Sequence, residues 1–128
     1  MSNPEQLVIL KQGAKAWNRW RKKHPEIKPD LRRVNLEKAD LREYNLTRSN
    51  LRWVNFSEAD LSYCDLSSSD LSHADFRNAN LSNADLSNTI LYDCDFRNAN
   101  LDQANREWSL ANNKTMFSKN TEEGDFSI

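Results

Sequence analysis

A large apolar residue at every fifth position is the feature that most constrains this chain. From Leu31 to Leu101 this residue is always Leu or Phe, in fifteen consecutive occurrences. The residue before each is Asp or Asn, with Ile90 as the exception, and the residue two before is usually small, as at Ala39 and Ala59. A period of five fits neither a helix, at roughly 3.6 residues, nor a strand, which alternates. It predicts a chain that turns a corner every five residues and stacks its turns, because so short a repeat cannot bury its own apolar face.

The spacing of the phenylalanines predicts the number of sides. Phe56, Phe76 and Phe96 are twenty residues apart. A coil of four pentapeptides would therefore stack their rings on one side of the column. Leu36 would lie beneath them, and a second column would consist of Leu31, Leu51, Leu71 and Leu91.

The five positions of the repeat are, in order, a small residue, Asp or Asn, Leu or Phe, a polar residue and any residue. It stands as ADLRE at residues 39–43 and ADLSN at residues 84–88. In this pattern the chain resembles the pentapeptide repeat family. The resemblance implies a mainly β fold, a right-handed quadrilateral β-helix of about four coils that are spaced like paired strands, ~4.8 Å apart.

Residues 4–23 are predicted to form one helix ahead of the coil. Asn3 can cap it, Pro4 suits its first turn and Pro25 ends it. Its apolar stripe has helical spacing and consists of Leu7, Leu10, Ala14 and Trp17. Such a helix would cover the first coil, whose core and strand edges need a lid. The alternative is a basic, Trp-bearing element that contacts a membrane or a nucleic acid.

The lead-in AWNRWR at residues 16–21, followed by PDL at residues 29–31, resembles the N-terminal cap of cyanobacterial pentapeptide repeat proteins. Large inward corner residues cluster early in the coil, so Tyr44 is expected where the coil meets this cap. The repeat ends at Arg106, which stands at a Leu position. We therefore predict a single domain, divided into an N-terminal helical cap (1–28), a pentapeptide-repeat coil (29–105) and a C-terminal cap and tail (106–128).

The C-terminal part is predicted to contain a short helix. Asp102 could cap it, with Ala104, Trp108 and Ala111 on one side. Trp108 would then cover the last coil. Residues 119–128 have little to pack against and are predicted to fray.

The corners pose a separate question, because no repeat contains Gly. Gly at the last position of a pentapeptide would allow the positive φ of a type II turn. A bulky residue there costs roughly 1–2 kcal/mol, and most of fifteen such corners would exceed a typical stability of ~5–15 kcal/mol. The sequence therefore predicts type I corners, with any type II corners confined to Asn78, Asn83, Asn88, Asp93 and Asn98.

The residues that catalysis or metal binding requires are not grouped in this sequence. His24 and His73 are the only histidines, and neither belongs to a ligand cluster. The Ser and Asp residues would lie on a convex column rather than in a concave site. We expect no enzyme activity, no cofactor, no metal and no small-molecule substrate. Cys64 and Cys94 fall on opposite inward corners and are predicted to be buried thiols rather than a disulfide.

Charge is unevenly distributed along the chain. Residues 1–42 carry a net charge of +6 and residues 43–128 a net charge of −7, which gives the overall −1. No apolar run reaches membrane-spanning length and no signal-peptide pattern precedes the helix. A cytoplasmic protein is therefore expected.

One side of the column has unusual outward residues. On the side of Leu31 and Leu91 they include Arg and aromatic residues and the exceptional Ile90, whereas the other sides carry mainly Ser, Asn and Asp. Arg and aromatic residues are typical of interface centres, although single exposed aromatics are also normal on protein surfaces. The candidate interaction face consists of Arg32, Arg33, Arg52, Trp53, His73, Ile90 and Tyr92.

These features predict a monomeric protein-interaction scaffold, with a protein partner that the sequence does not identify. Nucleic acid and membranes are not the expected partners. Some members of the family are acidic mimics of duplex DNA that bind DNA gyrase, and the resemblance leaves this as an alternative. Outward Asp residues suit such a mimic, but Arg52, Arg77 and Arg97 interrupt them.

Overall fold

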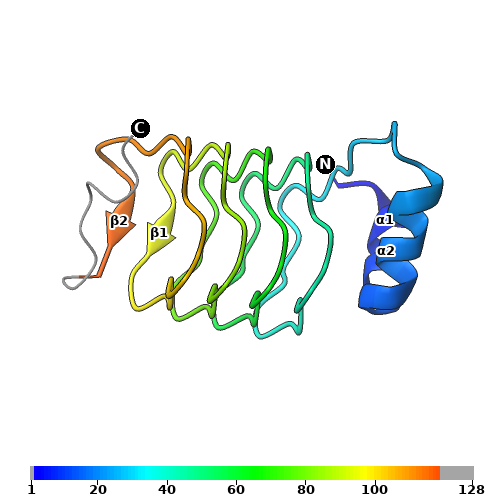
Figure 1. The fold of residues 1–128 in the computed structure, drawn as a ribbon, viewed down its shortest axis with the longest axis horizontal. Helices are drawn as coiled ribbons and strands as arrows, with labels where there is room; N and C mark the ends of the chain where they lie inside the picture. The colour runs from blue at the N-terminus through cyan, green and yellow to red at the C-terminus, as the bar shows by residue number, and fades with distance from the viewer. Residues whose placement is uncertain (1, 119–128) are drawn as a thin grey trace.

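The computed structural model describes residues 2–118. Two helices, α1 (Pro4–Leu10) and α2 (Ala14–Lys23), lie across one end of a column of stacked coils (Figure 1). Two short strands, β1 (Asp95–Phe96) and β2 (Met116–Phe117), pair in parallel at the other end. The fold is a β-helix, and regular strand within the described residues is confined to these two strands. The sides of the other coils are joined by single parallel bridges.

The bridges fix a coil of twenty residues. Each joins an Asp or Asn position, or its equivalent, to the residue twenty further along, from Asp30↔Asn50 to Ile90↔Leu110. The pair Asp95↔Met116 is twenty-one residues apart, so one residue is inserted before β2. The four-sided register predicted from the phenylalanine spacing is therefore the observed one.

In the pentapeptide of residues 59–63, every backbone N–H group has an acceptor. Three N–H groups reach carbonyls of the neighbouring coils, one closes the corner, and one is bound by the side chain of Asp60. The N–H groups of Ala59, Asp60 and Leu61 donate to the carbonyls of Phe56, Ala39 and Asn80, at 3.0, 2.9 and 2.7 Å. The Ser62 N–H donates to Asp60 Oδ1 at 3.0 Å, and the Tyr63 N–H donates to the Ser82 carbonyl at 3.1 Å. The Asp or Asn of the repeat is thus an acceptor for the backbone two residues later, an Asx turn.

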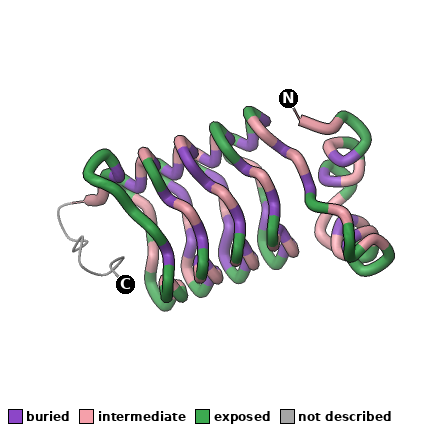
Figure 2. The backbone as a smooth tube through the Cα atoms, turned by 90° about the horizontal axis from the view of Figure 1, so that it is seen from above, coloured by how far each residue is buried: buried purple, intermediate pink, exposed green. Residues whose placement is uncertain are grey.

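The core is a set of ladders along the column axis. Phe56 stacks on Phe76 with ring centroids 4.9 Å apart, and Phe76 stacks on Phe96 at 4.8 Å. The Leu columns of the other sides are also buried (Figure 2). Phe117 extends the phenylalanine ladder, with its centroid 5.5 Å from that of Phe96. The one-residue insertion hides Phe117 from the five-residue pattern.

All fifteen pentapeptide corners have a residue in the left-handed region, so the type I prediction is wrong. φ lies between 53° and 65° at the last position of all fifteen pentapeptides and also at Trp108. In the corner from Leu61 to Cys64, the Cys64 N–H donates to the Leu61 carbonyl at 3.0 Å. Tyr63, the third residue of this turn, has a φ of 60°, whereas Ser62 is not among the positive-φ residues. This is the type II pattern.

The prediction failed because it considered the strain at each corner residue and left out the hydrogen bonds that the corner makes to the neighbouring coils. Type I and type II turns differ by a flip of their central peptide. In the same corner that peptide carries the Ser62 carbonyl, which accepts from the Glu43 N–H at 3.2 Å, and the Tyr63 N–H, which donates to the Ser82 carbonyl at 3.1 Å. A flip would break both bonds, and an unpaired buried backbone group costs about 1–3 kcal/mol.

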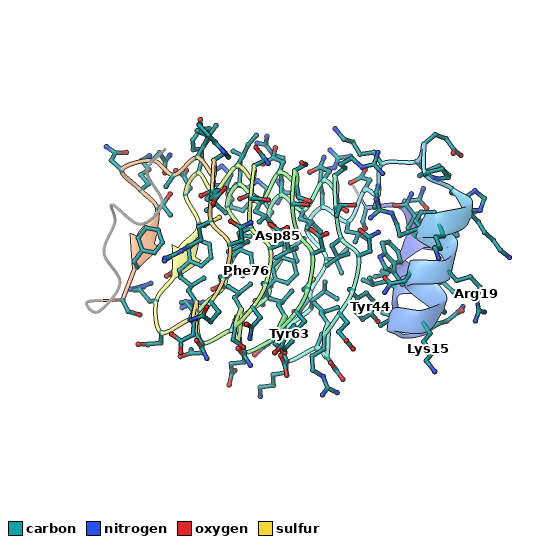
Figure 3. The ribbon with its side chains drawn as sticks, in the orientation of Figure 1. Lys15, Arg19, Tyr44, Tyr63, Phe76 and Asp85 are labelled. Atoms are coloured by element: carbon teal, nitrogen blue, oxygen red, sulfur yellow. The ribbon has the colours of Figure 1, made fainter. Side chains whose placement is uncertain are left out.

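The N-terminal segment forms two helices rather than the single helix predicted. The break lies at Gly13, whose φ of 108° is not helical. Asn3 caps α1 as predicted, because its Oδ1 accepts from the N–H groups of Glu5 and Gln6. The two-helix arrangement brings the end of α1 over Tyr44, whose hydroxyl donates to the Leu10 carbonyl at 2.8 Å. Tyr44 thus lies at the junction predicted for it (Figure 3).

Side chains of α2 bind the outer edge of the first coil. Trp17 is fully buried and its Nε1 donates to the Asn45 carbonyl at 2.7 Å. Arg21 donates to the same carbonyl at 2.9 Å and to the Thr47 carbonyl at 2.8 Å. Asn18 accepts from the Asn45 N–H at 2.8 Å. A strand edge that a further coil would have paired is satisfied here by a helix.

The C-terminal helix predicted after Asp102 does not form. Bridges join Asp85 to Asn105 and Ile90 to Leu110, so the coil continues beyond the last regular repeat. Trp108 is a corner residue with 61% of its surface exposed, and it does not cover the last coil. The predicted fraying of residues 119–128 lies outside the described residues.

Candidate interaction face

Three residues of the candidate face form one stack along a corner of the column. Arg33, Trp53 and His73 hold the last pentapeptide position in consecutive coils, so their backbones lie above one another. The Trp53 and His73 rings are parallel within 3°, with centroids 4.1 Å apart. The guanidinium carbon of Arg33 lies 5.2 Å from the Trp53 centroid, within reach of a cation–π contact.

The stack continues through two residues that sequence reasoning left out. His73 Nδ1 lies 3.4 Å from a carboxylate oxygen of Asp93. Asn112 in turn donates to Asp93 Oδ1 at 2.8 Å and accepts from the Asp93 N–H at 3.0 Å. The twenty-residue spacing from His73 could have identified Asp93, but Asn112 follows Asp93 by nineteen residues and is out of register.

This packing limits what Trp53 can offer a partner. Both faces of its indole are covered, by Arg33 on one side and His73 on the other. About half of the residue, 47%, remains exposed. Trp53 therefore presents a rigid edge rather than a free face on which a planar ligand could stack.

The other two arginines of the face are engaged with carboxylates. Arg32 Nη2 lies 2.8 Å from Asp30, and this hydrogen bond lowers the pKa of Asp30 below its usual value. Arg52 Nη1 lies 3.4 Å from Asp70. Their positive charge is thus partly neutralised within the face.

Ile90 breaks a hydrogen-bonding column on this side. Asn50 and Asp70 hold the same position in earlier coils and accept from the backbone N–H two residues later, at 3.3 and 3.0 Å. Ile90 has no acceptor to offer the N–H of Tyr92. Tyr92 is 40% exposed, whereas Ile90 itself is half-buried and is paired in register with the exposed Leu110. Leu110 was missed because the regular repeat ends before it.

One depression lies beside the candidate face and another lies on a different side of the column. A groove of about 280 Å³ runs beside the face and is lined by Lys28, Asn50, Asp70 and Ile90, among others. A wider and shallower depression of about 670 Å³ lies between the start of α2 and the coil, near Lys15, Arg42 and Tyr63. Lys28, Arg42 and Tyr63 were not among the predicted site residues.

The described residues hold no cluster of three or more His, Cys, Asp or Glu side chains that could bind a metal ion. The thiols of Cys64 and Cys94 are free and buried, and each faces a backbone carbonyl, of Tyr44 and Leu71 respectively. Burial raises the pKa of both thiols well above its usual value. Neither group is therefore a nucleophile at neutral pH.

Comparison with known proteins decides the family. A family model described as a pentapeptide repeat region matches residues 29–106. This chain belongs to the pentapeptide repeat family. Among solved structures, the pentapeptide repeat protein alr5209 from Nostoc PCC 7120 is 30% identical, with a TM-score of 0.76, over 82% of this chain and 87% of that one.

A second cyanobacterial structure, the pentapeptide repeat protein Rfr23 from Cyanothece 51142, is also 30% identical. It has a TM-score of 0.55, over 72% of this chain and 67% of the other. No curated protein matches the chain. No helix in residues 2–118 is long and apolar enough to cross a membrane.

Proposed function

We propose that this pentapeptide repeat protein is a non-enzymatic, monomeric scaffold of the cytoplasm whose candidate interaction face binds a protein partner. The observation that carries the proposal is Ile90. It replaces an Asp or Asn that would bind the Tyr92 N–H, so the chain lacks a hydrogen bond there and instead places a half-buried apolar side chain beside the exposed Tyr92 and Leu110. A residue that weakens the fold is typical of a functional site.

The stack of Arg33, Trp53, His73 and Asp93 supports the same face. These side chains are held by one another, so a partner that docks on them need not order them. Ile90 and Tyr92 supply apolar and aromatic contact area on the same side. Arg52, paired with Asp70, supplies a polar rim.

The test is capture of a partner from a cyanobacterial lysate by the wild-type protein and by two matched variants. Ile90→Asn with Tyr92→Ser should lose the captured protein and stay folded. Tyr63→Ser removes an aromatic residue that is 65% exposed on another side and should retain it. Equal capture by all three proteins would exclude this face as the binding surface.

Mimicry of DNA, acting on DNA gyrase, is the alternative function. The ion pairs of the column weaken it: Arg42, Arg77 and Arg97 lie 2.6 to 2.7 Å from Asp40, Asp75 and Asp95 and neutralise much of their charge. A gyrase supercoiling assay separates the two functions. Inhibition at micromolar concentration would favour the mimic, and the absence of inhibition would remove it.

A further inference from the structure

The outward surface of α2 is a row of cations. At about 100° per residue, Lys15, Arg19, Lys22 and Lys23 fall within an arc of roughly 100°. All four are exposed, and the buried Trp17 and Arg21 lie on the opposite side of the helix. Figure 3 shows the Lys15 and Arg19 side chains directed away from the column. We call these four residues the cationic face.

The cationic face differs from the other charged surfaces in lacking counter-charges. Within residues 2–118 no ion pair joins any of its four cations to a carboxylate, whereas Arg42, Arg77 and Arg97 on the column are all paired. Residues 2–29 contain only two acidic residues, Glu5 and Glu26. The helix therefore holds a positive potential at the end of a molecule in which residues 43–128 carry a net charge of −7.

The apolar side of the same helix is not free to insert into a lipid bilayer. Trp17 is fully buried against the coil, and Trp20 packs on Trp17 and on His24, with ring centroids 5.1 and 5.6 Å apart. A contact made by α2 is thus electrostatic and leaves the fold unchanged. The cationic face therefore differs from an amphipathic helix, which binds a membrane by burying its apolar face.

We propose that the cationic face docks end-on on an anionic lipid surface. Basic clusters of four or more residues attract anionic headgroups, at about 1 kcal/mol per Lys or Arg near the surface. In this pose the acidic column points away from the membrane, and most of it lies beyond the screening length of about 8 Å at physiological salt.

A planar surface fits the surroundings of α2 better than a nucleic-acid groove does. Glu43 is exposed and lines the same depression as Lys15, so an acidic residue lies at the edge of the row of cations. A groove that embraced the helix would bring phosphates against Glu43. A flat layer of headgroups contacts only the outermost atoms, which belong to the cations.

The test measures sedimentation of the full chain with two kinds of vesicle. Wild type should bind phosphatidylcholine vesicles that contain about a third phosphatidylserine, and it should not bind pure phosphatidylcholine vesicles. Arg19→Gln with Lys22→Gln should weaken binding roughly thirty-fold, because two cations are removed. Arg77→Gln with Arg97→Gln lowers the net charge equally, on the column, and should bind nearly as wild type does.

Three results would overturn the proposal. They are no preference for anionic vesicles, an equal loss in the two variants, or displacement of bound protein from the vesicles by a short duplex DNA that binds it more tightly at the same salt. Lys15→Gln with Lys23→Gln serves as a second pair and should repeat the thirty-fold loss. All substituted cations are exposed, so the melting temperatures of the α2 variants should match that of wild type.

Discussion

Nε1 of Trp17 donates a 2.7 Å hydrogen bond to the carbonyl of Asn45, a residue twenty-eight positions later on the outer edge of the first coil. The indole is at the same time fully buried against the apolar end of the column. One side chain thus meets both needs of an open β-helix end, a partner for an edge carbonyl and a cover for the core. Arg21 shares the same carbonyl, at 2.9 Å.

Removal of this side chain should strongly destabilise the protein. Trp17→Ala is expected to cost about 3–5 kcal/mol, because it leaves a cavity and removes one of the two hydrogen bonds to the Asn45 carbonyl. Trp108→Ala, at a corner that is 61% exposed, should change the unfolding free energy by less than about 0.5 kcal/mol. Denaturant unfolding measures both. Similar losses in the two variants would show that the helices do not stabilise the column.

The type II corners predict that glycine has opposite effects at adjacent positions. Glu58 has a φ of 59°, so Glu58→Gly relieves about 1–2 kcal/mol of strain against an entropic cost of about 0.5–1 kcal/mol, and should raise the melting temperature. Ser57 is not among the residues with a positive φ, so Ser57→Gly brings only the entropic cost of glycine and should lower the melting temperature. Thermal unfolding decides. A type I corner would give losses at both positions.

Ile90→Asn should stabilise the fold and weaken partner binding. The new side-chain oxygen would accept the Tyr92 N–H, as Asp70 Oδ1 accepts the Ser72 N–H at 3.0 Å, with an expected gain of about 0.5–1.5 kcal/mol. Asp70→Ile is the reverse change, and it should destabilise by a similar amount or more. If Ile90→Asn lowered the melting temperature, the half-buried Ile90 would be a packing residue, and its presence at an Asp or Asn position would say nothing about function.

The arginine–carboxylate pairs should make stability fall in acid. The side-chain hydrogen bond from Arg42 lowers the pKa of Asp40 to about 2. Burial raises the pKa of Asp95, and the hydrogen bonds from Arg97 outweigh burial and leave it below the usual value. Carboxyl groups with lowered folded-state pKa values stabilise the protein above their unfolded pKa, near 4, and this stabilisation is lost as the pH falls through the folded values.

The expected acid profile is therefore a flat melting temperature from neutral pH to about pH 4 and a decline toward pH 2. In the double variant Arg42→Gln with Arg97→Gln, the decline over the same range should be shallower, since those pKa values return toward normal. The side chains of Arg42, Asp40 and Arg97 are more than half exposed, although that of Asp95 is only 15% exposed, so screening by salt should reduce the difference, mainly through the Arg42–Asp40 pair. Identical profiles for the two proteins would show that the pairs do not contribute.

The sequence by itself determined the family, the coil of twenty residues, the phenylalanine ladder and the place of Tyr44. The coil and the ladder follow from periodicity, because a strict repeat of five brings the same side chain to the same side of each coil. The family follows from the residue types of the repeat, and the place of Tyr44 from its size at an inward corner beside the cap. The Asp and Asn positions were also readable, since their side chains bind backbone two residues away. The candidate face could be named as a column of outward residues for the same reason.

Only the tertiary structure decided the corners, because the preference of a single residue for negative φ is outweighed by two hydrogen bonds to coils twenty residues away in the chain. It also decided that Trp53 is enclosed between Arg33 and His73, and that Asn112 and Phe117 join ladders from outside the repeat register. The break at Gly13 divides the one predicted helix into two, and this arrangement places Leu10 over Tyr44 and Trp17 over Asn45. These contacts join residues that are far apart in the sequence, so local sequence patterns do not predict them.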